Sequence, residues 1–145
     1  MIFVYKKWNN FCKMLNDNGI RSITAEDVLK KGEDRYIILK HDVEADVYRA
    51  YRFAKIESKY GHRGSFYVQA YLLRNKKNIH ILKEIQKLGH EVSYHYDVLD
   101  ACKGNIDLAI NEFALNISLF KNNGFNVTTV CQHGNPIIER KGYTS

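Results

Sequence analysis

Two carboxylates follow an apolar run early in the chain and are spaced to lie on one side of a β-strand. The run at 36–39 leads into the stretch HDVE at 41–44. Because side chains alternate along a strand, Asp42 and Glu44 are expected on one side and His41 on the other. Two carboxylates this close repel each other unless a cation or a hydrogen-bond donor lies between them, and a divalent metal ion is the strongest such neutraliser. The stretch therefore favours metal chemistry.

A helix cap is the alternative role for both carboxylates. Asp42 and Glu44 would then stabilise the N-terminus of a helix that begins near Ala45, although Asp46 is better placed for that cap. His41 is expected to be hydrogen-bonded beneath a layer of helices rather than to bind a metal, because it points to the other side of the strand. On these residues alone, the metal site and the helix cap both remain open.

Two later strand-like stretches also end in ionisable side chains. The stretch YHYD closes one at 94–97, and CQHGN closes the other at 131–135. In parallel α/β folds the loops after the carboxyl ends of the strands converge on one face. His95 and His133 are therefore expected to complete a metal shell with the carboxylates. Zn²⁺ accepts mixed imidazole and carboxylate ligands, and a catalytic zinc site keeps one position for water.

The other histidines and two tyrosines are expected to have structural roles. His90 precedes a strand and is predicted to be structural, whereas His62 and His80 lie at the opposite ends of their units and are predicted to be surface residues. Tyr94 and Tyr96 flank a strand-end histidine and are predicted to pack on their neighbours as strand-forming residues.

A repeated unit positions these strand ends. Four amphipathic stretches each end in a glycine and lead into a β-rich run, and glycine readily adopts the left-handed backbone that follows a helix. The glycines are Gly19, Gly61, Gly89 and Gly124. Helices are predicted at 4–17, 45–60, 78–88 and 105–122, and strands at 36–42, 64–69, 90–95 and 126–132. Alternating strands and helices indicate parallel pairing through right-handed crossovers, so the predicted fold class is α/β.

Length and composition limit the classes of protein that the chain represents. Its 145 residues suit one domain, 1–145. Hydrophobic residues make up 45% of the chain and charged residues 26%, and this balance is typical of a globular protein. We recognise no secretory signal. The cysteines also lack the spacing of a disulfide framework or of a zinc knuckle, so we expect a cytoplasmic location. The net charge of +6 comes from scattered basic residues, so no nucleic-acid or membrane partner is expected.

Together the motifs resemble the polysaccharide deacetylase-like enzymes, which share the NodB homology domain with carbohydrate esterase family four. The pieces are LKHDVEAD, RAYRFAKIESKYGHRGSFYV, LKEIQKLGHEVSYHYD and QHGNP, in this order over roughly residues 5–136. Members of the family adopt an irregular (β/α) barrel and use a divalent metal ion, commonly zinc, to hydrolyse N- or O-acetyl groups on sugars. The resemblance implies a partial (β/α) barrel of about four parallel strands with flanking helices, and a carbohydrate substrate.

The resemblance also assigns roles to individual residues. Asp42 matches the family's general base and Glu44 its metal-binding acid. The implied reaction is attack by a water molecule that the metal activates and from which Asp42 takes a proton.

The match to the family's other metal ligands is incomplete. His95 matches the first histidine of the family's His-x-x-x-His motif, whereas Leu99 stands in the place of the second. Asp97 or His133 is the expected substitute as the third ligand. His133, with Pro136 three residues later, also resembles the motif in which a basic residue orients the base.

A second departure from the family is length. The family domain is usually longer, and its later strands bring the histidine that protonates the leaving group, so this chain is expected to hold about half a barrel and to lack its C-terminal part. An open half-barrel exposes strand edges, which favours a homodimer or a covering partner chain. Two other functions stay open: an inactive module that binds metal or stacks Tyr67, Tyr94 and Tyr96 on a sugar, and a structural part of a larger assembly.

Overall fold

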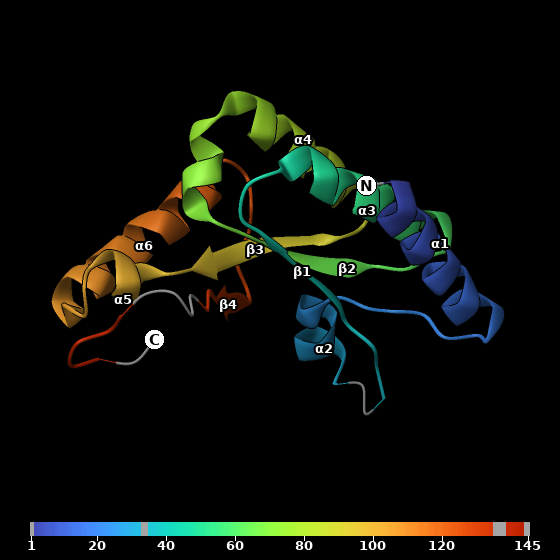
Figure 1. Cartoon of the computed structure of the whole chain (residues 1–145), viewed down its shortest axis with the longest axis horizontal. Coiled ribbons are helices and arrows are strands. Elements are labelled where there is room, and N and C mark those ends of the chain that lie inside the picture. The colour runs from blue at the N-terminus through green and yellow to red at the C-terminus, as the bar shows by residue number, and fades with distance from the viewer. Residues whose placement is uncertain (1, 33–34, 135–138, 144–145) are drawn as a thin grey trace.

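Four parallel strands form a single curled sheet in the order β1-β2-β3-β4 (Figure 1). The structure, a computed structural model, describes residues 2–32, 35–134 and 139–143. The strands are β1 (Leu39–Val43), β2 (Gly64–Val68), β3 (Glu91–Tyr96) and β4 (Val130–Gln132). Each strand pairs with the next along the chain, and helical segments fill the crossovers. The prediction of an α/β half-barrel with about four parallel strands and flanking helices is thus confirmed.

Helices cover the sheet unequally. They are α1 (Ile2–Asp17), α2 (Ala25–Lys31), α3 (Val47–Lys59), the 3-10 helix η1 (Ala70–Arg74), α4 (Lys76–Lys87), α5 (Val98–Ala101) and α6 (Ile106–Asn122). Figure 1 shows α3 and α4 on one side of the sheet and the short α2 on the other. Within the described ranges, no helix combines the length and the apolar character that crossing a bilayer requires.

The predicted elements are present, with shifted boundaries. The helices predicted at 45–60 and 105–122 are α3 and α6, and the strand predicted at 64–69 is β2. The strand predicted at 126–132 is shorter, because only Val130–Gln132 pairs with β3. All four glycines that were expected to follow helices have a positive φ, between 70° and 92°, which confirms the left-handed backbone there.

Three short helical segments, α2, η1 and α5, were not predicted. The signal for α2 was readable: the Thr24 hydroxyl accepts from the Asp27 backbone N–H at 3.1 Å, and the Asp27 carboxylate accepts from the Thr24 backbone N–H at 3.3 Å. This reciprocal pair is a capping box. It fixes the start of a helix that lies against the polar face of the sheet.

The two faces of the sheet differ in chemistry. The outward side chains form the core with the helices and include Phe66, Val68, Val92 and Tyr94. The opposite face carries polar side chains, of which Ser65, Tyr67, Ser93 and His95 are almost fully buried. This separation follows from the alternation of side chains along each strand. Polar chemistry is therefore concentrated on the inner face of the half-barrel.

The prediction that His62 lies at the surface is wrong, because it is only 1% exposed. Its Nδ1 accepts from the Ser22 backbone N–H at 3.2 Å, and its Nε2 donates to the Cys12 carbonyl at 2.9 Å. The segment that follows α1 folds back over His62 and covers it. His80 is exposed, as predicted, and His90 is 4% exposed, which agrees with its predicted structural role.

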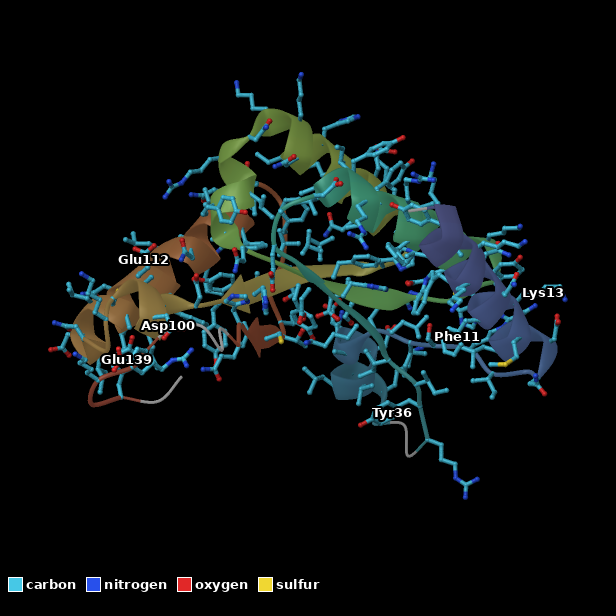
Figure 2. The ribbon with its side chains drawn as sticks, viewed as in Figure 1. Phe11, Lys13, Tyr36, Asp100, Glu112 and Glu139 are labelled. Atoms are coloured by element: carbon cyan, nitrogen blue, oxygen red, sulfur yellow. The ribbon has the colours of Figure 1, made fainter. Side chains whose placement is uncertain are left out.

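The segment 139–143 is held beside α5. Arg140 Nε and Nη2 donate to the two carboxylate oxygens of Asp100 at 2.8 and 2.7 Å. Figure 2 labels Asp100 and Glu139 in this region. The hydrogen bonds from Arg140 hold the pKa of Asp100 below its usual value. Both ends of this ion pair therefore stay charged at neutral pH.

Candidate metal centre

Three possible ligand atoms converge at the carboxyl ends of the strands. Glu44 Oε1 lies 3.0 Å from His133 Nδ1 and 3.5 Å from His95 Nε2. The two ring nitrogens, His95 Nε2 and His133 Nδ1, are 3.1 Å apart. We call these three residues the Glu44 group. The structure thus brings together three of the residues that the sequence analysis singled out.

The curl of the sheet makes this meeting possible. Glu44 directly follows β1 and His133 directly follows β4, so two strands separate them. In a flat sheet with strands about 4.8 Å apart, the first and fourth strands would be roughly 14 Å from each other. Val43 is level with Val68, and Val68 with Tyr94, so the next residues on β1 and β3, Glu44 and His95, share one level.

The hydrogen bonds of His95 favour metal binding through Nε2. His95 is 1% exposed, and its Nδ1 lies 3.0 Å from the carbonyl oxygen of Cys131, to which it donates. In the neutral ring this leaves the lone pair on Nε2, toward Glu44 and His133. Histidines that bind metals usually donate their other N–H to a carbonyl or a carboxylate in this way.

The spacing of the Glu44 group fits a small divalent ion. Ligands about 2.0–2.1 Å from a tetrahedral zinc ion lie roughly 3.3 Å from one another. The three separations, 3.0, 3.1 and 3.5 Å, bracket that value. The Glu44 side chain is 49% exposed, so solvent reaches the group from one side. One carboxylate and two imidazoles are a donor set that Zn²⁺ accepts, with one position left for water.

A second set of possible ligands overlaps the first. Atoms of Asp42, His95 and Cys131 lie within 4.8 Å of one another. We call these residues the Cys131 group, and it shares His95 with the Glu44 group. Cys131 had no predicted ligand role, because an isolated cysteine carries no spacing signal.

Lys40 places a positive charge against two members of the Cys131 group, Asp42 and Cys131. Its Nζ lies 2.9 and 3.0 Å from the two carboxylate oxygens of Asp42. Burial favours loss of the Lys40 proton, but hydrogen bonds to Asp42 and Cys131 outweigh it and raise the pKa of Lys40 above its usual value. Lys40 precedes Asp42 by two residues, so strand alternation was the signal that could have found it.

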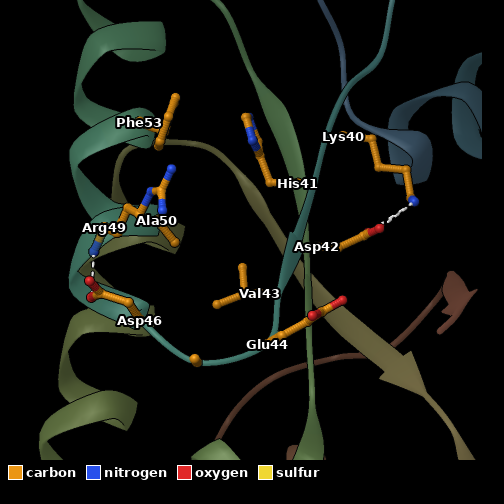
Figure 3. Close-up of a pocket in the computed structure, with 10 residues that line it drawn as sticks. Lys40, His41, Asp42, Val43, Glu44, Asp46, Arg49, Ala50 and Phe53 are labelled. Carbon is orange, nitrogen blue, oxygen red and sulfur yellow. Dashed lines mark hydrogen bonds and ion pairs between the residues drawn. The ribbon is translucent and has the colours of Figure 1, made fainter. Parts of the chain in front are cut away.

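A cavity of about 470 Å³ lies along β1 and the first turns of α3 (Figure 3). Asp42 and Glu44 point to one side of β1 in Figure 3, and His41 and Val43 point to the other. The predicted alternation is therefore confirmed. Arg49 and Phe53 line the cavity from α3. The cavity is therefore lined by residues from both sides of β1 and by α3.

Other residues near the strand ends have different roles. Asp46, as predicted, caps α3, and its Oδ1 accepts from the Arg49 backbone N–H at 2.9 Å. Asp97 belongs to neither ligand group and precedes α5, where it lines a small hollow with Leu99 and His133. Pro136 lies outside the described residues.

Two of the three tyrosines that the alternative function would stack on a sugar are buried. Tyr94 is 1% exposed and packs against Phe113 and Phe120, which confirms its predicted packing role. Burial raises the pKa of Tyr94 to about 12. Tyr67 is 5% exposed, and its hydroxyl lies 3.0 Å from that of Thr129. Sugar stacking on these two rings is therefore a wrong prediction.

Comparisons of this chain with protein-family models, with curated proteins and with solved structures found no match. The chemistry of the site therefore rests on its own residues.

Proposed function

We propose that this chain is a metal-dependent hydrolase that removes N- or O-linked acetyl groups from a carbohydrate, as the resemblance to NodB-type polysaccharide deacetylases implies. One observation carries the proposal: Glu44, His95 and His133 present three ligand atoms 3.0–3.5 Å apart. The carboxylate of Asp42 lies within 4.8 Å of the shared histidine. A candidate ion site with a base beside it supports hydrolysis of an acetyl group by water that the ion activates.

Each residue has a separate part in the proposed reaction. A divalent ion, when bound, supplies Lewis acidity for the acetyl carbonyl and for the attacking water. Asp42 takes the proton of that water, and the Lys40 ammonium holds the Asp42 carboxylate in position through its contacts with both oxygens. His95 is held in one tautomer by the Cys131 carbonyl.

The proton that Asp42 accepts is passed on to the leaving group in the last step of the proposed reaction. Water adds to the acetyl carbon, the C–N or C–O bond breaks, and Asp42 returns its proton to the departing amine or hydroxyl. Acetate and the free sugar group are the products. Asp42 thus acts as base and then as acid, which requires no further ionisable side chain.

The test combines metal analysis with turnover of acetylated amino-sugar oligomers. Wild-type protein is expected to bind one zinc ion, and Glu44→Ala and His133→Ala should bind less than stoichiometric zinc. Asp42→Asn should retain zinc but lose roughly a hundredfold or more of its turnover, as expected for a general base. His80→Ala, which alters an exposed histidine far from the site, is the matched control.

Two results would contradict the proposal. Zinc bound equally by the wild type and by both ligand variants would remove the Glu44 group from metal binding. Zinc bound stoichiometrically without release of acetate would favour the alternative of an inactive metal-binding module.

A further inference from the structure

We propose that the Cys131 group is a second cation site, selective for thiophilic divalent ions such as Cd²⁺ and mutually exclusive with the Glu44 group. Its ligands are a carboxylate oxygen of Asp42, a ring nitrogen of His95 and the sulfur of Cys131, all within 4.8 Å. The loss of activity that such an ion would cause rests on the proposed function, whereas the binding itself does not.

The donor set determines the class of ion. A thiolate is a soft ligand from which Cd²⁺, a softer ion than Zn²⁺, gains most, whereas the Glu44 group offers only oxygen and nitrogen donors, which zinc also accepts. Cys131 is half-buried and is not in a disulfide, so its sulfur binds a metal once the Lys40 hydrogen bond is displaced. On binding, the thiol releases its proton to solvent and no electron is transferred.

Shared use of His95 makes the two sites exclusive. One ring nitrogen of His95 already donates to the Cys131 carbonyl, so a single nitrogen remains for a metal. An ion in one group therefore removes a ligand from the other. An ion in the Cys131 group also binds Asp42, which would then be unable to accept a proton.

Lys40 sets the preference between the groups. Its ammonium contacts both oxygens of Asp42, so a cation entering the Cys131 group must displace it. For an ion that gains little from sulfur, this repulsion favours the Glu44 group. For a thiophilic ion, the new metal–sulfur bond offsets the loss.

The experiment is a titration of the full chain with Cd²⁺, followed by the near-ultraviolet absorption of cadmium thiolate. One equivalent should produce the band in the wild type and in Glu44→Ala, and Cys131→Ser should abolish it. Cys102→Ser, a second half-buried cysteine outside both groups, is the matched control and should retain the band. Lys40→Met should tighten Cd²⁺ binding roughly tenfold, because a nearby positive charge is removed.

Zinc-loaded protein tests exclusivity. Each equivalent of Cd²⁺ should release one equivalent of zinc, measured with a chromophoric chelator. A cadmium thiolate band that survives Cys131→Ser, or that is lost in Cys102→Ser, would overturn the site. Zinc and cadmium ions bound to the protein at the same time would overturn exclusivity. An unchanged affinity in Lys40→Met would overturn the role of Lys40. Because Glu44→Ala keeps the Cys131 group, a failure of the Glu44 group as the zinc site leaves this band unaffected.

Discussion

His41 Nε2 lies 2.5 Å from Glu57 Oε1, and this contact joins β1 to α3 on the face opposite the candidate metal centre. The Glu57 side chain has no exposed surface, and the indole N–H of Trp8 donates to the same oxygen at 3.1 Å. Among the described residues, its other oxygen has no hydrogen-bond partner. A buried carboxylate is costly unless it is paired, so His41, as the nearest partner, contributes most to making Glu57 tolerable in the core.

Removal of His41 alone should therefore destabilise the protein more than removal of the pair. His41→Leu is expected to lower the free energy of unfolding by about 3 kcal/mol, because Glu57 stays buried without its main partner. The double variant His41→Leu, Glu57→Leu should recover a large part of that loss. Urea denaturation of the wild type, both single variants and the double variant measures the coupling. If the loss of stability in the double variant equals the sum of the losses in the two single variants, His41 and Glu57 are not energetically coupled.

Gly64 approaches the same carboxylate closely. A Cβ at this position would lie 2.5 Å from Glu57 Oε2 and 2.9 Å from the Leu39 carbonyl oxygen. Gly64→Ala should lower the free energy of unfolding by more than about 2 kcal/mol, because the backbone of β1 has to move. Denaturation by urea measures the change. Gly134→Ala, where a Cβ meets nothing within 4 Å, is the control, and equal stability of both variants would contradict the close approach.

Acid should weaken the fold through His90. Burial holds the pKa of His90 below its usual value, against the attraction of Glu57. Below about pH 6.5 the unfolded chain protonates this histidine while the folded chain resists, so the free energy of unfolding falls as pH drops. Above that pH the contribution is fully present.

The variant His90→Gln isolates this effect. Denaturation at pH 7.5 and at pH 5.5 should show a smaller loss of stability in His90→Gln than in the wild type. His80→Gln, at an exposed position, should keep the wild-type pH dependence. Identical pH dependence in the wild type and in His90→Gln would contradict the prediction.

Cys12 should be inert in the folded protein. Burial, together with the charge of Glu57, raises its pKa to about 12, and the side chain has no exposed surface. Because the thiolate is the reactive form, iodoacetamide at pH 8 should label Cys102 and Cys131 but not Cys12. Mass spectrometry of peptides measures the labelling. Urea should abolish the protection, and rapid labelling of Cys12 without urea would contradict it.

Sequence patterns of short range predicted much of the fold and part of the site. Alternation placed Asp42 and Glu44 on one side of β1, and glycines marked the ends of four helices. Alternation also predicted that His41 is hydrogen-bonded beneath the helices, but its partner Glu57 and the burial of His62 depend on segments that are far apart in the chain. Cys131 is near Asp42 only because the sheet curls. Such contacts leave no local periodicity, so the sequence alone did not reveal them.

The curl also has a mechanical consequence. Glu44 follows the first strand and His133 follows the last, so an ion held by both would cross-link the two ends of the sheet. Part of the binding energy would then oppose any flattening of the half-barrel. Metal affinity would in turn depend on sheet curvature, so substitutions far from the ligands that change the twist of β2 or β3 would alter it.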